Sequence, residues 1–450
     1  MWKVHHSDIT VLGGGWSGIL SAFELRNKYP SASITILESS ESNELGGLLK
    51  SVNINGFTYD CGGPHILFSK HKEILDKIVN FLGDNVRRVE RKAYIYYKDQ
   101  KIPYPFENGM YMLKPEIRAE LGKDLLLAMI EIAKKGEWVP ETFKDWIYGF
   151  FGKSMGSTYL EPYNKKIWKM DPENMDASWV FTPGRLPFPS LDDITLSIAG
   201  CESIGYKEQQ YFYYPKEGGI QSLYNSLLKK LEALDINFMC GYRVDHISRE
   251  QKGWKINDEL ISENVVNTLP LRILPQIFKM PEEIVKCCHD LIYNRDVVIG
   301  IAIDKPGPIE HVLYVPSQKV NFHRMTWMSN LVQETPKNKS NLIAEITVPY
   351  DIPLDIIQIT DLAFEGMLEL GVINGRDEIL FTKTWVNEFG YPVYDLNHQT
   401  NRSKIMKYLN DLGIQTVGRW GSWHYWNTDM VYKAVLEMVD NFTLKKYNGE

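Results

Sequence analysis

The first forty residues alternate between apolar and polar positions in two different periods. Residues 8–13 (Asp-Ile-Thr-Val-Leu-Gly) have the alternation of a strand, and residues 33–38 (Ser-Ile-Thr-Ile-Leu-Glu) have the same character. Between them, residues 16–28 are apolar at close to helical spacing, at Ile19, Leu20, Phe23 and Leu25. The opening therefore predicts a strand, a glycine turn, a helix and a second strand.

The remaining chain divides into a helical stretch and several strand-rich stretches. From about 71 to 190 the pattern is mostly helical, with amphipathic runs broken by Pro and Gly. Strands are predicted over 236–269 and 295–350. The final part predicts, in order, a helix near 356–370, a strand near 378–385, a strand into Gly418, an aromatic loop and a helix over about 429–442.

Composition narrows the class of protein. The 450 residues are 44% hydrophobic and 24% charged, which is ordinary for a globular chain with two or three domains. The net charge of −7 argues against binding to nucleic acid or to an anionic membrane. No stretch approaches the ~20 apolar residues of a membrane helix. Because the amino terminus resembles no signal peptide, we expect a cytoplasmic protein.

The cysteines give no sign of a metal site. They are odd in number and scattered without metal-ligand spacing, at Cys61, Cys201, Cys240, Cys287 and Cys288. Cys287 and Cys288 precede His289, but they follow a helix-like segment and are interpreted as helix residues. We therefore expect reduced thiols and no metal.

A glycine motif follows the first predicted strand. Gly13, Gly15 and Gly18 satisfy G-x-G-x-x-G at the start of a helix, with Trp16 and Ser17 inside the motif. The first glycine permits a tight turn, the second lets backbone approach a pyrophosphate, and the third allows close helix–strand packing. Glu38 ends the next strand, where a carboxylate can accept ribose hydroxyls. Motif, context and Glu38 together predict a dinucleotide site.

Two further features favour FAD over NAD. Gly46 and Gly47, followed by Leu48, form a second glycine pair just beyond Glu38. Near the carboxyl end, Gly418 and Arg419 precede a helix that begins around Asp429. A helix start there would direct backbone donors at the flavin pyrimidine, which favours negative charge on reduced flavin. Predicted cofactor contacts from this segment are Gly418, Arg419, Asn427, Asp429 and Met430.

These patterns predict an α/β fold. Because β–α signals near both ends flank a helical middle, we expect a Rossmann-type FAD-binding domain built from discontinuous segments. The expected boundaries are 1–70, 205–280 and 386–450 for this domain. Residues 71–204 would form a mainly helical insertion, and 281–385 a mainly antiparallel sheet that binds substrate.

Several segments resemble one family, in order along nearly the whole chain. Gly56-Phe57 with Asp60-Cys61-Gly62-Gly63-Pro64-His65-Ile66 looks like the flavin-side histidine loop of UDP-galactopyranose mutases. Their other motifs resemble Tyr163-Asn164-Lys165-Lys166-Ile167-Trp168, Trp179, Gly184-Arg185, Tyr314-Val315-Pro316, Phe322-His323-Arg324, Ser329-Asn330, Tyr391-Pro392 and the run from Gly418 to Asp429. The last run is closer to the eukaryotic-type form.

The resemblance implies an isomerase. Such a mutase interconverts the pyranose and furanose forms of a UDP-hexose through a flavin N5–sugar adduct, for cell-surface glycan biosynthesis. FAD would be active as reduced FADH−, so the implied partners are a UDP-sugar or other nucleotide sugar and NAD(P)H or another reductant. A homo-oligomer is compatible with the sequence.

The resemblance also implies site residues. Arg185 and Arg324 match the pair of diphosphate arginines, whose guanidinium forks suit phosphate oxygens. His65 matches the histidine beside the flavin, and these three residues are the predicted catalytic set. The predicted substrate contacts are Asn164, Trp168, Arg185, Tyr314, Arg324, Asn330, Tyr391 and Tyr425.

Each candidate also has a purely structural interpretation. Arg185, between two prolines, fits a surface loop, and Arg324 fits a solvent-facing strand position. His65 fits a buried histidine, while Tyr314, Tyr391 and Trp168 fit core packing.

Two other functions remain open. An oxidoreductase of the amine oxidase or protoporphyrinogen oxidase type shares the cofactor motifs, but does not explain two arginines with three tyrosines. A flavin-binding protein without activity is the third hypothesis. The Gly-Gly-Pro-His loop, Leu48-Leu49-Lys50 and His424 depart from the family pattern and leave room for a paralogue.

Overall fold

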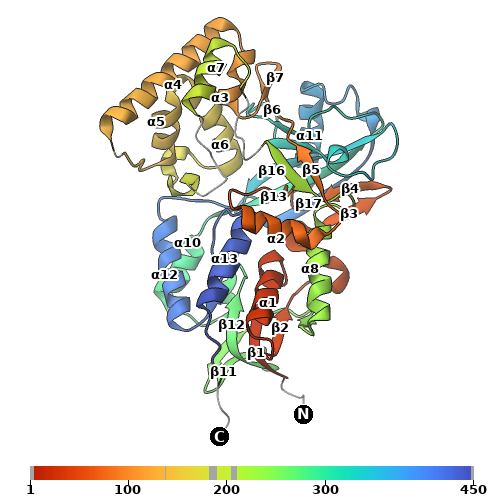
Figure 1. Cartoon of the computed structure of the whole chain (residues 1–450), viewed down its shortest axis with the longest axis vertical. Helices are drawn as coiled ribbons and strands as arrows, with labels where there is room; N and C mark the ends of the chain where they lie inside the picture. Colours follow the sequence, from red (N-terminus) through yellow and green to blue (C-terminus); the bar gives the residue numbers. More distant parts are fainter. Residues whose placement is uncertain (1–4, 137, 182–189, 204–209, 447–450) are drawn as a thin grey trace.

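The computed structural model describes residues 5–136, 138–181, 190–203 and 210–446. At one end, drawn at the bottom of Figure 1, lies a largely parallel sheet with strand order β10-β11-β12-β1-β2-β9, in which β18 also pairs with β12. The strands are β1 (His5–Leu12), β2 (Ile34–Leu37), β9 (Asn237–Met239), β10 (Ile247–Glu250), β11 (Gly253–Ile256), β12 (Leu260–Asn267) and β18 (Gln415–Thr416). The central strands β1, β2 and β12 are buried along most of their length.

Helices from distant parts of the sequence cover this sheet. Figure 1 shows the first and last segments of the chain side by side, because α1 packs against both α8 and α13. Their side chains share one hydrophobic core with β1 and β2. The helices around this end are α1 (Trp16–Lys28), α2 (Lys72–Leu82), α8 (Gln221–Ala233), α9 (Leu274–Ile277), α10 (Glu282–Asp290), α12 (His398–Asp411) and α13 (Thr428–Asn441). The Rossmann-type α/β fold predicted from the sequence is confirmed.

A second, mainly antiparallel sheet follows, with strand order β17-β13-β16-β15-β14-β6-β7. β6 and β7 come from the stretch that the sequence predicts to be mainly helical. The strands are β6 (Ala93–Tyr97), β7 (Gln100–Pro103), β13 (Tyr293–Ile303), β14 (Val312–Tyr314), β15 (Arg324–Trp327), β16 (Ser340–Pro349) and β17 (Ile379–Pro392). Short pairs flank it: β3 (Ser51–Ile54) with β4 (Phe57–Asp60), and β5 (Arg87–Glu90) with β8 (Tyr211–Tyr214).

The two faces of the second sheet contact different layers. Along β13, Val297, Ile299 and Ile301 share a core with α11 (Ile356–Glu369). Val298 and Ala302 point to the opposite face and join the core of the cofactor-side layer. This second sheet therefore lies between α11 and the dinucleotide-binding layer, as Figure 1 also shows.

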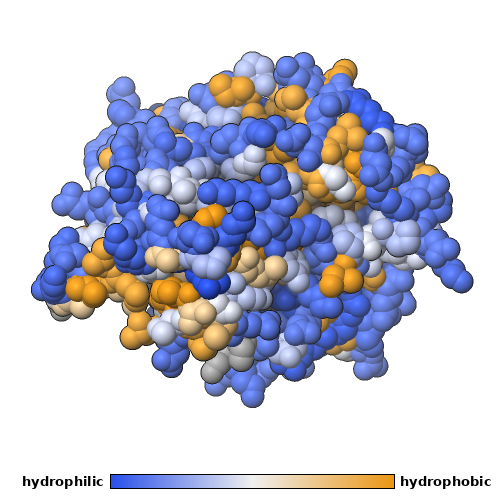
Figure 2. Space-filling view, turned by 90° about the horizontal axis from the view of Figure 1, so that it is seen from above, coloured by the Kyte–Doolittle hydropathy of each residue, from blue (hydrophilic) through white to orange (hydrophobic). Residues whose placement is uncertain are grey.

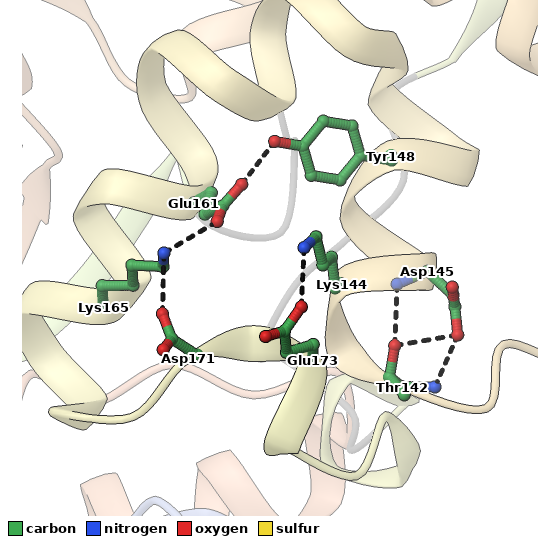
Figure 3. Close-up of polar contacts among 8 residues, drawn as sticks. All are labelled: Thr142, Lys144, Asp145, Tyr148, Glu161, Lys165, Asp171 and Glu173. Atoms are coloured by element: carbon green, nitrogen blue, oxygen red, sulfur yellow. Dashed lines mark hydrogen bonds and ion pairs between the residues drawn. The ribbon is translucent and has the colours of Figure 1, made fainter.

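The far end of the molecule is helical. It comprises α3 (Phe106–Gly109), α4 (Pro115–Lys135), α5 (Phe143–Met155), α6 (Glu161–Trp168) and α7 (Leu191–Ala199). Thr142 and Asp145 form a capping box that starts α5. Figure 3 shows how polar contacts then fix α6: Glu161 accepts a hydrogen bond from Tyr148, and Lys165 pairs with both Glu161 (2.9 Å) and Asp171 (2.7 Å).

The surface of this helical end carries exposed apolar side chains. Figure 2 views the molecule from this end and shows hydrophobic patches among hydrophilic residues. Leu127 and Ile130 on α4 and Leu191 and Leu196 on α7 are among the exposed hydrophobic residues.

At the other end of the molecule, Cys287 and Cys288 are buried within α10, as the helical interpretation expects. Within the described ranges, no helix combines the length and apolar character needed to cross a membrane.

A substitution of Gly300 in β13 would test how closely the second sheet packs against the cofactor-side layer. A Cβ atom at this position would lie 2.7 Å from Trp385 and 2.8 Å from Tyr59. We therefore expect Gly300→Ala to lower the free energy of unfolding by about 1–3 kcal/mol through overpacking. Urea denaturation would measure the change, and an unaltered midpoint would contradict the packing described here.

Candidate cofactor and substrate site

A cavity of about 490 Å³ opens where the glycine turn after β1 meets the amino end of α13. It brings together many of the residues predicted to contact the cofactor: Gly13, Gly15, Trp16, Ser17, Glu38, Gly47, Leu48, His65, Arg419 and Asn427. Gly18, Gly46, Gly418, Asp429 and Met430 do not line it. We call this space the cofactor pocket.

The three motif glycines have different environments. Gly13 has φ +94°, and a Cβ there would lie 2.7 Å from the Thr268 hydroxyl. A Cβ on Gly18 would overlap the carbonyl oxygen of Gly13, so this glycine lets α1 pack onto β1. No atom lies within 4 Å of the corresponding position at Gly15, which faces the pocket. The amino end of α1 is thus open to a phosphate group, and the residues fit a dinucleotide.

Glu38 is oriented by backbone donors. Its carboxylate accepts hydrogen bonds from the N–H groups of Gly14 (2.7 Å) and Ser40 (2.8 Å). Tyr224 donates to the carbonyl of Gly14 at 2.7 Å and supports the turn from another side. The carboxylate is therefore held at the pocket wall, where it can also accept ribose hydroxyls.

The carboxyl-terminal motif completes the pocket. The indole of Trp16 donates to the carbonyl of Thr428 (3.3 Å), which ties α1 to the start of α13. Gly418 has φ +101° and lies against Ser17. This glycine therefore allows the carboxyl-terminal segment to approach α1 closely, but it does not line the cofactor pocket. Arg419 donates to the carbonyls of Gly390 (2.7 Å) and Trp426 (3.1 Å), and its guanidinium lies 4.6 Å from the Tyr425 ring centre.

A second cavity of about 220 Å³ adjoins the cofactor pocket. Among the predicted substrate contacts, it brings together Asn164, Trp168, Tyr314, Arg324, Tyr391 and Tyr425. His65 and Asn427 line both spaces. We call the second space the substrate cavity. A ligand in it would lie next to a cofactor bound in the pocket.

The structure does not place two of the predicted substrate contacts, Asn330 and Arg185, at the substrate cavity. Asn330 lies away from both cavities, and its amide donates to the carbonyls of Pro308 (2.9 Å) and Glu310 (2.6 Å). It therefore links the turn after β15 to the segment that precedes β14. Arg185 belongs to residues 182–189, outside the part of the chain that the structure describes.

Asn164 and Trp168 form one wall of the substrate cavity. They lie one turn apart on α6, and the Trp168 indole donates to the Asn164 side-chain oxygen at 3.2 Å. The Trp168 ring also meets Tyr425 edge-on, with centroids 5.2 Å apart. This pair is packed mainly against itself and its aromatic neighbours.

Arg324 supplies one cation in this cavity. Glu345, which is buried in β16, accepts hydrogen bonds from its Nε (2.6 Å) and Nη2. The side chain of Arg324 is 23% exposed, so the guanidinium remains accessible at the cavity wall. Strand register explains the pair, because Arg324 and Glu345 are directly opposite in β15 and β16.

Some site residues are missing from the sequence-based set. Arg91 lines the substrate cavity and donates to the hydroxyl of Tyr314 at 2.9 Å. Glu345 and Asp296 are buried acids in strands of apolar residues. Glu345 and Asp296 could have been recognised from the sequence, because an acidic residue inside an apolar strand is buried and a buried charge needs a partner. Nothing in the sequence distinguishes Arg91 from its basic neighbours.

The protonation states suit hydrogen-bond donation. Burial raises the pKa of Tyr391 well above its ordinary value, so its hydroxyl keeps its proton. Burial, together with nearby Arg324, lowers the pKa of His323 well below its ordinary value. Neutral Tyr391 and neutral His323 therefore line the cavity beside the cations Arg324 and Arg91.

The fold and the glycine turn define the class of protein. Residues 11–80 match the family model described as an NAD(P)-binding Rossmann-like domain. The fold of the whole chain is shared with solved structures of a UDP-galactopyranose mutase and of a putative protoporphyrinogen oxidase.

These two solved structures match nearly the whole chain. A crystal structure of reduced UDP-galactopyranose mutase superposes with a TM-score of 0.85 at 23% identity, covering 98% of this chain and 93% of that one. A putative protoporphyrinogen oxidase from Exiguobacterium sp. 255-15 gives a TM-score of 0.73 at 16% identity, covering 98% and 99%. At these identities the likeness is one of fold.

Two curated relatives match parts of the sequence. Coproporphyrinogen III oxidase from Staphylococcus aureus (strain NCTC 8325 / PS 47) is 23% identical over 291 residues, and the match spans 59% of this chain and 61% of that protein. An uncharacterized protein in the nifH2 3' region of Methanothermococcus thermolithotrophicus is 30% identical over 105 residues, which are 23% of this chain and 97% of that protein. Over this stretch the chain and that protein belong to one family.

Two glycine substitutions separate folding from cofactor binding. Gly18→Ala should lower the free energy of unfolding by about 1–3 kcal/mol, because the new Cβ forces α1 away from β1. Gly15→Ala, at the N-cap of α1, should cost less than about 1 kcal/mol but weaken FAD binding at least about tenfold, because its Cβ enters the pocket. Denaturation and flavin titration would measure both. Equal effects of the two variants on FAD affinity at unchanged stability would contradict these assignments.

Proposed function

We propose that the chain is an FAD-dependent nucleotide-sugar mutase that interconverts the pyranose and furanose forms of a UDP-hexose. The observation that carries the proposal is the junction of the two cavities. Arg324, Tyr314, Tyr391 and Tyr425 line a cavity that shares His65 and Asn427 with the cofactor pocket. A diphosphate at Arg324 would bring the attached sugar close to a flavin. The fold likeness to reduced UDP-galactopyranose mutase supports this proposal.

The cavity residues would act on the leaving diphosphate. Reduced FAD, when bound, supplies the nucleophile for the anomeric carbon. Arg324 balances the charge that accumulates on the departing diphosphate, and the hydroxyls of Tyr314, Tyr391 and Tyr425 donate hydrogen bonds to it. Arg91 is a further cation at the same wall, held against Tyr314. We propose that Arg185 joins them.

His65 and Asn427 would position the cofactor against the sugar. Both residues line the cofactor pocket and the substrate cavity, so they lie at the boundary between the two ligands. Asn427 is the N-cap of α13, whose amino end favours negative charge on a reduced flavin. The aromatic walls, which include Trp168, Trp179 and Tyr163, exclude water from the reacting sugar.

An oxidoreductase of the protoporphyrinogen oxidase type is the second candidate. The partial match to coproporphyrinogen III oxidase favours it. Arg324 and Arg91 would suit a substrate carboxylate as well as a phosphate, so charge alone does not separate the two functions. They differ in redox balance: an oxidase must pass electrons onward from each substrate, whereas a mutase returns the flavin in the state in which it started.

Anaerobic turnover tests the proposal. The purified holoprotein, reduced with dithionite, would be incubated with UDP-galactopyranose or UDP-galactofuranose and the products separated by chromatography. We expect interconversion in the reduced sample and none in an oxidised control, because only the reduced flavin is nucleophilic. Oxygen consumption with coproporphyrinogen III provides the matched assay for the second candidate. No interconversion, together with oxygen consumption that requires both the protein and the porphyrinogen, would replace the mutase with the oxidase.

A further inference from the structure

A third, small cavity joins the other two. It has a volume of about 80 Å³ and is lined by Gly62, Gly63, Asp296, Arg324, Gly390 and Arg419, together with His65, Tyr391 and Tyr425. We call it the polar chamber. Its walls bring two guanidinium groups and a buried carboxyl group together beneath the Gly-Gly-Pro-His loop. The mutase mechanism described above assigns no part to that carboxyl group.

Strand register places Asp296 next to the Arg324–Glu345 pair. Glu345 is opposite Arg324 on one side and opposite Val298 of β13 on the other. Asp296 precedes Val298 by two residues, so its side chain points to the same face of the sheet as the Arg324–Glu345 pair. Its Cβ also lies against Gly390 of β17, where any larger residue would collide with it. The backbone and Cβ of Asp296 are therefore positioned by the pairing of β13 with β16 and β17.

One carboxyl oxygen of Asp296 has no hydrogen-bond partner among the residues that the structure describes. Asp296 is 2% exposed, and the oxygen in question is Oδ1. Both oxygens of Glu345 are engaged by Arg324, so Glu345 is an ion-paired carboxylate. Arg419 directs Nη1 and Nη2 at the backbone carbonyls of Trp426 and Gly390. Within the described ranges, a guanidinium group is hydrogen-bonded to Glu345 but not to Asp296.

The charge of the chamber depends on Asp296. Arg324 and Arg419 contribute two positive charges and Glu345 one negative charge. With Asp296 neutral, the group is net positive and suits an anion; with Asp296 ionised, the group is neutral. Burial, and after it the neighbouring Glu345, raise the pKa of Asp296 well above that of an ordinary carboxyl group, against the opposing effect of Arg324 and Arg419. Tyr391, Tyr425 and His65 are the other titratable groups that face the chamber.

We propose that Asp296 is a proton-linked positioning residue for the diphosphate: it takes up one proton when a nucleoside-diphosphate sugar binds at Arg324. This inference rests on the proposed function. A bound diphosphate repels an ionised Asp296 through the shared Arg324, so binding and protonation favour each other. Protonated Asp296 leaves the chamber net positive and keeps Arg324 oriented toward the ligand. Affinity for the sugar diphosphate therefore falls as the pH rises through the titration of Asp296 in the free protein.

Calorimetry on the oxidised holoprotein tests this inference without turnover. UDP-galactopyranose would be titrated in buffers of different ionisation enthalpy, at several values between about pH 6 and pH 9. The diphosphate diester keeps its charge in this range, so proton uptake must come from the protein. We expect uptake to approach about one proton per site, with affinity falling up to about tenfold per pH unit where Asp296 is ionised.

Two variants assign the proton to Asp296. Asp296→Asn is isosteric and always neutral, so uptake should disappear and affinity should become flat with pH. Asp395→Asn is the matched control: burial raises the pKa of Asp395, but this group lines neither cavity nor the chamber. Its uptake should equal that of the wild type. Should Asp296→Asn not fold, infrared difference spectra of wild-type protein labelled with ¹³C-aspartate must show a protonated-carboxyl band that appears on binding and shifts with the label.

The outcomes of these experiments distinguish the role of Asp296 from the proposed function. Binding without proton uptake, uptake retained in Asp296→Asn, or a missing aspartate band would overturn the role of Asp296 and leave the mutase proposal intact. A holoprotein that does not bind UDP-galactopyranose at any pH would overturn both the role of Asp296 and the proposed function.

Discussion

The ion pair between Arg324 and Glu345 is the interaction on which the rest of the site depends. Glu345 is buried, and its two oxygens hold the plane of the guanidinium at the wall of the substrate cavity. Burying a carboxylate is costly unless it is paired, and removal of one partner typically costs about 3–5 kcal/mol. The pair is set by the register of β15 and β16. The second sheet therefore determines where a substrate anion would meet its cation.

The second sheet also positions Arg324 relative to the cofactor pocket. One face of β13 packs on α11, and the other carries Asp296, Val298, Gly300 and Ala302 toward the cofactor-side layer. The pocket itself is closed by segments from opposite ends of the chain, because Trp16 bonds to Thr428 and Gly418 lies against Ser17. A flavin in the pocket and a diphosphate at Arg324 would share the walls formed by His65 and Asn427.

Short-range sequence patterns predict the glycine turn of the cofactor pocket, but they do not reveal every residue near the substrate cavity. The glycine turn, α1 and Glu38 follow from residues within forty positions of one another, and sequence suffices for such short-range structure. Glu345, Asp296 and Arg91 reach the site through strand pairings between distant residues, which periodicity does not reveal. Asn330 is the opposite case. It lies in a segment that resembles the family pattern, but its amide is hydrogen-bonded to the carbonyls of Pro308 and Glu310, and it lines neither cavity. The role of Arg185 stays a prediction.

A crystal structure of the FAD-loaded protein with UDP-galactopyranose bound would test most directly whether the two cavities form one site. We expect the diphosphate within hydrogen-bond distance of the Arg324 guanidinium, with Tyr314, Tyr391 and Tyr425 around it. The sugar should then lie against the flavin at the boundary formed by His65 and Asn427. A diphosphate bound away from Arg324, or a sugar directed away from the flavin, would contradict the central claim that the two cavities form one site for nucleotide-sugar chemistry.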